Sequence, residues 1–300
     1  MAALDAILPI FLLIVLGYGL CRANVLPADT AKGISLLAFK LFLPCVLLTG
    51  LADAPLREGF SPTLLLAYFV PALIVFIVTN IVVQRRFGVA TSLGLAASYS
   101  NNVLIGIPLI GALFGDAGLI YTFSILTFHA LTLFSFQSVY TAASGAGGFD
   151  KRALIQNLAN PLLIGILIGL TINLTGITLP DSVDHVLHWM AKAALPCALI
   201  MLGMNLSTFR LKPSQTAVVL SVVKLVAMPA AVLLLCLVAG LNPLARAVLV
   251  LMAANPAGVN VLAFARTPDD VRINSSTVLV TTVVSVISLP AWMTLLDWIG

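Results

Sequence analysis

The chain has 300 residues, of which 61% are hydrophobic and only 9% are charged. Soluble globular domains average about 45–50% apolar and about 25% charged residues, so this composition excludes a soluble protein and indicates an all-α polytopic membrane protein. The net charge of +4 does not indicate nucleic-acid binding, because the basic residues gather in one set of loops.

Ten apolar stretches approach the length of about 20 residues that a helix needs to cross a bilayer. In chain order they cover residues 4–21, 31–51, 63–83, 90–114, 118–140, 154–174, 183–206, 215–240, 244–265 and 275–297. We therefore predict ten transmembrane helices. An even number of spans places both chain ends on the same side of the membrane.

Lysine and arginine fall mainly in the loops on one side of these spans. That side holds Arg22, Lys32, Arg85, Arg86, Lys151, Arg152, Arg210, Lys212, Arg266 and Arg272, and the other side holds only Arg57 and Arg246. Cytoplasmic loops carry the excess of basic residues, so the first side is cytoplasmic. We expect an integral protein of a bacterial inner membrane, with both termini in the periplasm.

A short segment rich in Gly, Ala and Ser, residues 141–153, divides the chain into a first half, 1–140, and a second half, 154–300. Its composition is typical of a flexible linker. The halves match weakly, because Lys40-Leu41-Phe42-Leu43-Pro44-Cys45 in the second span corresponds to Lys192-Ala193-Ala194-Leu195-Pro196-Cys197 in the seventh. Five spans per half predict two inverted five-helix repeats, an arrangement common in secondary transporters.

Two spans are interrupted at similar depth by residues that disfavour a lipid-embedded helix. The fourth span contains Asn101, Asn102, Gly106 and Pro108, and the ninth contains Asn255, Pro256, Gly258 and Asn260. An unpaired backbone group in lipid costs several kcal/mol, so a break must face protein or a cavity. Matched breaks in the two halves indicate a substrate site, and exposed half-helix N-termini would favour an anion. The alternative is two ordinary kinks with asparagine joining helices.

Charged and titratable side chains inside spans are the next candidates. Lys40 and Lys192 lie near the middle of the second and seventh spans, where a charge costs at least about 2.5–3.5 kcal/mol. They could pair with an anionic substrate, or their side chains could extend to the membrane surface. His129, in the fifth span, could carry a proton or form a structural hydrogen bond. Lys224 has no counterpart in the first half and ranks lower.

Several kinds of site are absent from the sequence. No Asp or Glu lies in a span interior, so we expect no carboxylate-based cation or proton site, and sodium binding would have to use Asn, Ser and backbone carbonyl groups. The four cysteines are scattered and indicate neither a metal site nor a disulfide framework. No phosphate-binding glycine loop or hydrolase motif occurs, so we expect no cofactor, no metal and no enzymatic activity.

The first break is similar to a known family signature. The segment Ser100-Asn101-Asn102-Val103-Leu104-Ile105-Gly106-Ile107-Pro108-Leu109, followed by Ala112–Leu119, resembles the fourth span of the auxin efflux carrier family. Ala253-Ala254-Asn255-Pro256 and Asn260–Ala263 resemble its ninth span. The family includes bacterial permeases for malonate and other carboxylates, and the plant PIN carriers are relatives. Arg210–Ser214 and Met228-Pro229-Ala230 also resemble bile-acid/sodium symporters, which share the crossing-helix fold.

This resemblance implies ten helices with broken, crossing helices 4 and 9. It implies a scaffold of spans 1, 2, 6 and 7, a moving transport unit of spans 3–5 and 8–10, elevator-type alternating access and a homodimer. The residues of the two breaks would form the substrate site.

We therefore predict a secondary active transporter or facilitator of small organic anions, such as malonate or auxin-like acids. One alternative is a sodium-coupled symporter of larger, bile-acid-like anions. A second alternative is a membrane sensor or scaffold that binds a ligand without transporting it.

Overall fold

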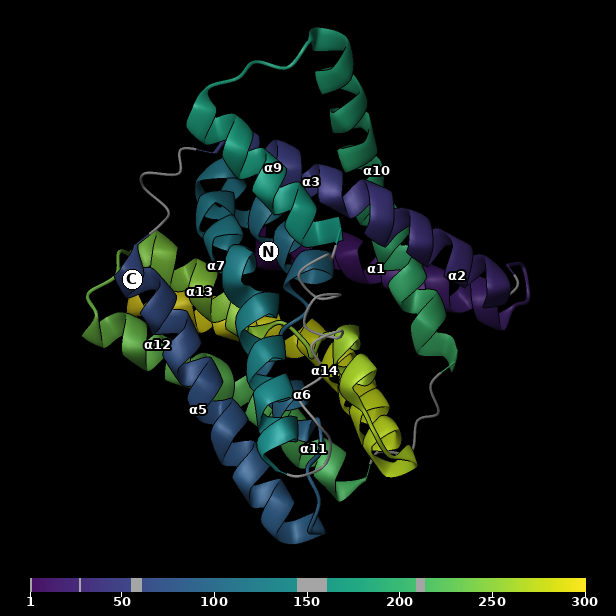
Figure 1. Ribbon diagram of the computed structural model, residues 1–300, viewed down its shortest axis with the longest axis vertical. Helices are drawn as coiled ribbons and strands as arrows, with labels where there is room; N and C mark the ends of the chain where they lie inside the picture. The colour runs from purple at the N-terminus through teal and green to yellow at the C-terminus, as the bar shows by residue number, and fades with distance from the viewer. Residues whose placement is uncertain (1, 27, 55–60, 145–160, 209–213) are drawn as a thin grey trace. The chain divides into compact units, whose positions relative to one another are not determined.

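The computed structural model describes residues 2–26, 28–54, 61–144, 161–208 and 214–300 (Figure 1). In these segments the backbone is almost entirely helical, with one isolated antiparallel bridge between Ser100 and Ala257 and no strand. The chain forms two compact units. Unit 1 comprises Met1–Gly59, Val103–Phe123 and Leu158–Phe209, and unit 2 comprises Phe60–Asn102, Ser124–Asn157 and Arg210–Gly300.

Unit 1 is built around close helix pairs. Its elements are α1 (Ala2–Arg22), α2 (Ala28–Leu37), the π-helical turn η1 (Ala38–Phe42), α3 (Leu43–Ala52), the first part of α7 (Ile107–Ala143), α9 (Pro161–Thr175) and α10 (Asp181–Thr208). Helix α1 packs on α10, and α3 packs on α9. A Cβ atom on Gly17 would collide with the backbone of Ile200, and one on Gly203 with the backbone of Ile14. Small residues let membrane helices approach this closely.

Unit 2 contains both interrupted segments. Its elements are α5 (Pro62–Phe87), α6 (Leu93–Ser98), the start of the π-helical turn η2 (Asn102–Gly106), the rest of α7, α11 (Gln215–Val222), the π-helical turn η3 (Val223–Ala227), α12 (Met228–Val238), α13 (Pro243–Ala254), the 3₁₀ turn η4 (Val259–Phe264) and α14 (Pro268–Ile299). Helix α5 packs against α6 and α12, while α13 packs against α12 and α14 (Figure 1).

Capping residues fix where several unit 2 helices begin. The Asn242 side chain accepts a hydrogen bond of 2.8 Å from the Ala245 N–H, and Pro243 opens α13. Thr267 does the same for α14, accepting from the Asp270 N–H at 3.1 Å ahead of Pro268. An Asn or Thr N-cap followed by proline is a strong helix-start signal. The cap at Asn242 therefore fixes the first residue of α13, which ends just before the break at Asn255.

Among the described residues, six helices are long and apolar enough to cross a membrane: Lys32–Ala52, Pro62–Phe87, Asn102–Ala143, Asp181–Thr208, Gln215–Val238 and Pro268–Ile299. The same part of the chain has three shorter apolar helices, Leu8–Arg22, Pro161–Thr175 and Pro243–Ala254. The all-helical membrane protein expected from the composition is confirmed at this level. The count of ten spans and the inverted repeat remain predictions.

The fourth and fifth predicted spans are not separated by a loop. The helical stretch Asn102–Ala143 runs through both and changes direction at Gly115, whose φ of 56° and ψ of −150° are not helical. Glycine adopts this positive φ without a steric penalty, so Gly115 alone connects the two helical parts.

Some predicted features lie outside the described residues. These are most of the linker 141–153, the start of the sixth span, and the basic residues Arg57, Lys151, Arg152, Arg210 and Lys212.

Candidate functional site

The two interrupted segments meet as extended backbone inside unit 2. Helix α6 ends at Ser98 and α13 ends at Ala254. The Asn101 N–H donates to the Pro256 carbonyl at 2.8 Å, and the Gly258 N–H donates to the Tyr99 carbonyl at 3.1 Å. These bonds pair groups that the breaks remove from their helices, which is what a membrane interior requires. We call residues 99–102 and 255–258 the crossover.

A chain of buried side chains extends from the crossover. Asn255 Nδ2 donates to Asn102 Oδ1 at 2.8 Å, and Asn102 Nδ2 donates to the Tyr68 hydroxyl at 3.0 Å. The Tyr68 hydroxyl in turn lies 3.3 Å from His129 Nε2. All four side chains are buried. Buried polar networks of this kind fix side-chain geometry when their members are paired.

Besides the Ser100 hydroxyl oxygen, two polar atoms of the crossover, both on amide side chains, remain unpaired. Asn101 Nδ2 is a donor without an acceptor, and Asn255 Oδ1 is an acceptor without a donor. Asn101 is 6% exposed and Asn255 is 0% exposed. A buried polar group without a partner costs about 1–3 kcal/mol, and such groups are uncommon enough to need an explanation. A ligand that accepts at Asn101 and donates at Asn255 would supply both missing partners.

An aromatic stack forms one wall of the crossover. The ring of Tyr99 stacks on His129 and Phe134, with centroids 4.5 and 4.8 Å apart. The Tyr99 ring also covers Gly258, where an added Cβ atom would lie 2.5 Å from a ring carbon. The close approach of this ring therefore explains why glycine follows the second break.

The chain is similar to known membrane proteins over almost its whole length. A family model described as "Membrane transport protein" matches residues 2–144 and 149–293. The chain belongs to this membrane transport protein family. The finding confirms the resemblance to auxin efflux carriers.

Several proteins similar to this chain are named as transporters. An "Uncharacterized transporter" of Methanothermobacter thermautotrophicus is 27% identical over 304 residues, covering 99% of each chain. A "Putative malonate transporter" of Rhizobium meliloti is 25% identical over 294 residues, covering 93% of this chain and 91% of the relative. The "Uncharacterized transporter YfdV" of Escherichia coli K12 is 23% identical over 299 residues, covering 96% and 95%. These names describe transporters and not enzymes.

The site residues predicted for this family member divide between the two units. Asn101, Asn102, Asn255, Pro256 and Gly258 come together in the crossover, and His129 lies at the end of the side-chain network. Asn260 belongs to η4 and is partly buried.

The other predicted site residues belong to unit 1. Gly106 and Pro108 lie where η2 meets α7. Lys40 lies in η1 and Lys192 in α10, and both side chains are exposed. Unit 1 therefore holds both members of the lysine pair suggested by the sequence, and neither is buried.

The third lysine of the spans, Lys224, is the buried one. It lies in η3 with 0% exposure, and its Nζ donates to the Ala253 carbonyl at 2.6 Å. The sequence carried a signal for this residue, a charge inside an apolar span, but the lack of a counterpart in the first half lowered its rank. Tyr68 and Thr281 also contact the network or the crossover, and no sequence pattern distinguishes them from ordinary span residues.

The predicted spans leave Asp270 in a loop, but the structure places it at the start of a helix and buries it. Helix α14 begins earlier than predicted, so Asp270 lies in its first turn and is 2% exposed. Its carboxylate accepts hydrogen bonds from the Ser92 N–H at 3.2 Å, the Ser92 hydroxyl at 3.0 Å and Asn274 Nδ2 at 2.9 Å. The Arg266 N–H donates as well, at 3.2 Å. With so many donors, this carboxylate joins the start of α6 to α14 as a bound anion.

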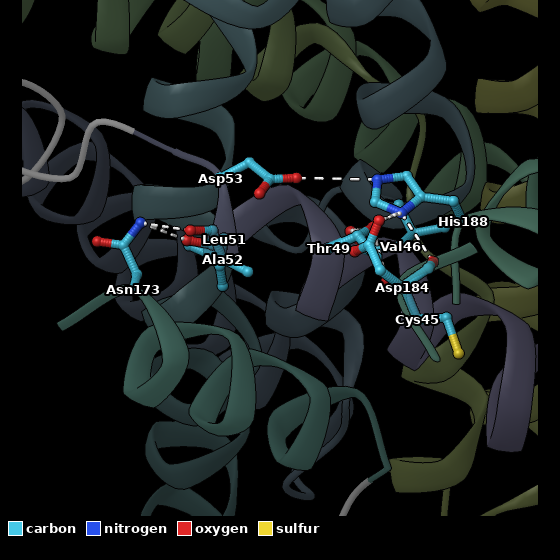
Figure 2. Close-up of polar contacts among 9 residues, drawn as sticks. All are labelled: Cys45, Val46, Thr49, Leu51, Ala52, Asp53, Asn173, Asp184 and His188. Carbon is cyan, nitrogen blue, oxygen red and sulfur yellow. Dashed lines mark hydrogen bonds and ion pairs between the residues drawn. The ribbon is translucent and has the colours of Figure 1, made fainter. Parts of the chain in front are cut away.

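Unit 1 contains a separate cavity of about 380 Å³ lined in part by Thr49, Gly50, Asp53, Asp116 and His188. Figure 2 shows His188 between Asp53, at 3.8 Å, and Asp184, at 3.3 Å. Figure 2 also shows Asn173, whose Nδ2 donates to the Leu51 and Ala52 carbonyls at the end of α3. Within the described part of the chain, no cluster suited to a metal ion is present. Carboxylates at this cavity would repel an anion, so the crossover is the better anion site.

Proposed function

We propose that this membrane transport protein is a secondary carrier of small organic anions, with a carboxylate-bearing substrate bound at the crossover. The observation that carries the proposal is the pair of unpaired polar atoms, Asn101 Nδ2 and Asn255 Oδ1, at the meeting point of two broken segments. An amide N–H is a suitable donor to a carboxylate oxygen. The free amide oxygen of Asn255 suits a hydroxyl or a protonated acid group on the same substrate.

The broken segments add an electrostatic argument for an anion. Helical turns begin at Asn102, the last residue of the first crossover segment, and at Val259, directly after the second. Helix N-termini favour negative charge by about 0.3–1 kcal/mol when exposed and up to about 2 kcal/mol when partly buried. The relative in Rhizobium meliloti named for malonate belongs to the same class of substrate.

We further propose ten spans in two inverted repeats and elevator-type alternating access in a homodimer. The division into units supports this, since the predicted spans 1, 2, 6 and 7 fall in unit 1 and the predicted spans 3, 8, 9 and 10 in unit 2. The stretch Val103–Phe123, from the fourth and fifth spans, groups with unit 1, which departs from the division that the family resemblance implies. We place both termini in the periplasm on the loop charges.

The proposal is tested by uptake of labelled malonate and related acids into proteoliposomes. We expect Asn101→Ala and Asn255→Ala to lower uptake about ten- to a hundredfold, because a hydrogen bond to a charged group contributes about 1.5–3 kcal/mol. Asn205→Ala is the matched control, since among the described residues the Asn205 side chain bonds Met201 of its own helix in unit 1. Uptake that is equal in all three variants would contradict the site.

A thermal-shift series on the same purified proteins separates the carrier from a sensor. A sensor or scaffold would be stabilised by the acid and would lose that stabilisation in Asn101→Ala, yet would show no uptake in proteoliposomes. Stabilisation together with uptake supports the carrier.

A further inference from the structure

The side-chain amino group of Lys224 is fully buried and has a backbone partner. Its Nζ donates at 2.6 Å to a backbone carbonyl, that of Ala253, a short distance typical of charge-assisted hydrogen bonds. The ion pairs between described residues all involve other side chains. A buried charge of this kind is expensive unless something compensates it, so the compensation must come from the backbone.

The Ala253 carbonyl lies at the negative end of a half-helix. Helix α13 ends at Ala254, because Asn255 has an extended ψ of 148° and Pro256 follows. The last four carbonyls of a helix lack partners within it, and together they carry a partial negative charge of about half an electron. In transporters with discontinuous helices, such C-terminal ends coordinate the coupling cation.

A distortion in the neighbouring helix brings Lys224 to this end. Pro229 lacks an N–H and leaves the Leu225 carbonyl without its helical donor. The indole Nε1 of Trp292 donates to that carbonyl at 2.8 Å. The helix forms the wider π turn η3 here, and π turns occur frequently at functional sites. Within this turn Lys224 and Leu225 are buried, whereas Val226 is exposed.

We propose that the Lys224 ammonium permanently occupies the cation position at the C-terminal end of α13, so that the crossover carries its own cation and needs no bound sodium ion. The inference rests on the proposed carrier function and specifies its coupling. A tethered ammonium replaces a diffusible ion at the same carbonyl. The sodium-coupled alternative is therefore disfavoured for this chain.

The test uses a truncation that vacates the position. We compare the thermal stability of purified Lys224→Ala in choline chloride, sodium chloride and ethylammonium chloride at equal ionic strength. We expect the Tm of the variant to fall in choline and to rise by several degrees in sodium or ethylammonium, because a ligand that binds only the folded state stabilises it. The wild-type Tm should be the same in all three salts.

Two controls separate a cation site from a simple cavity. Leu220→Ala removes a buried apolar side chain of unit 2, and its loss of Tm should be the same in every salt. Lys224→Met fills the position with an apolar chain and should be insensitive to the cation. If Lys224→Ala cannot be isolated in choline, the yield obtained with ethylammonium or sodium becomes the readout.

The outcomes are distinct. A cation response confined to Lys224→Ala supports the inference, even if no acid is transported, in which case only the carrier function fails. Equal behaviour of Lys224→Ala and Leu220→Ala in all salts contradicts it. Wild-type anion uptake that stops when potassium replaces sodium also contradicts it.

Discussion

The two short half-helices of unit 2, α6 and α13, each meet a buried charge, and they meet it at opposite ends. Asp270 binds at the start of α6 through Ser92, and Lys224 binds at the end of α13 through Ala253. Each charge lies where the helix dipole favours its sign. Within its described residues, unit 2 thus buries both a carboxyl group and a lysine side chain without a direct ion pair between them.

The difference lies in how completely each charge is paired. The Asp270 carboxylate accepts from Ser92, Arg266 and Asn274, whereas the Lys224 ammonium has three N–H donors and one carbonyl partner, that of Ala253. A saturated charge fixes two elements together. The Lys224 side chain is held by one carbonyl, and we expect another cation to take that position when the lysine is truncated.

The largest effect is expected from Asp270→Asn. The amide would place a donor against the N–H groups of Ser92 or Arg266, and each lost hydrogen bond to a charged group contributes about 1.5–3 kcal/mol. We expect a large fall in Tm and in the yield of monodisperse protein. Asp269→Asn is the matched control, because Asp269 is exposed and its ion pair among the described residues is with Arg272, so its effect should stay below about 1 kcal/mol. Equal losses in the two variants would show that Asp270 does not anchor α6.

A smaller effect is expected from Gly258→Ala at the second break. The new Cβ atom would lie 2.5 Å from the Tyr99 ring, and that ring is stacked between His129 and Phe134. Overpacking of this kind costs about 1–3 kcal/mol, and we expect anion uptake to fall with it. Gly33→Ala is the control, because an added Cβ atom at Gly33 meets nothing within 4 Å. The Tm of the Gly33→Ala protein should not decrease. An unchanged Gly258→Ala would mean that the Tyr99 ring can move aside.

The smallest effect is expected from Trp292→Phe. This change removes the donor to the Leu225 carbonyl, and one such hydrogen bond contributes about 0.5–1.5 kcal/mol. We expect a Tm lower by a few degrees. Trp298→Phe, at an exposed position, should leave Tm unchanged. A Trp292→Phe protein as stable as the wild type would show that η3 is held without this bond.

Features that depend on neighbouring residues in the chain, such as the helices and their interruptions, were predictable from the sequence. Long apolar runs predict the membrane helices, and Asn, Gly and Pro inside them indicate two interruptions. The structure has these at residues 99–101 and 255–258, whereas Gly106 and Pro108 lie in the helical turns that follow the first one. The family resemblance read from the same residues is confirmed.

Long-range features were not predictable in the same way. No nearby residue in the sequence indicates that Asn102 Nδ2 donates to the Tyr68 hydroxyl, or that the Thr281 hydroxyl accepts a hydrogen bond from the Ala257 N–H. Asp270 was placed in a loop because helix ends are poorly defined by hydrophobicity alone, whereas the Thr267-Pro268 cap starts α14 two residues before it. Lys224 has no counterpart in the first half of the sequence, yet it is buried, whereas the matching pair Lys40 and Lys192 is exposed.

The pairing of Asn102 with Asn255, 153 residues apart in the chain, also has a consequence for biosynthesis. At a synthesis rate of about 5–20 residues per second, roughly 8–30 s separate the emergence of the two asparagines from the ribosome. During that interval the first interruption lacks residues 255–258, whose backbone pairs with it in the folded protein. The nascent first half therefore depends on water, lipid headgroups or the insertion machinery to hold Asn101 and Asn102 until the second half arrives.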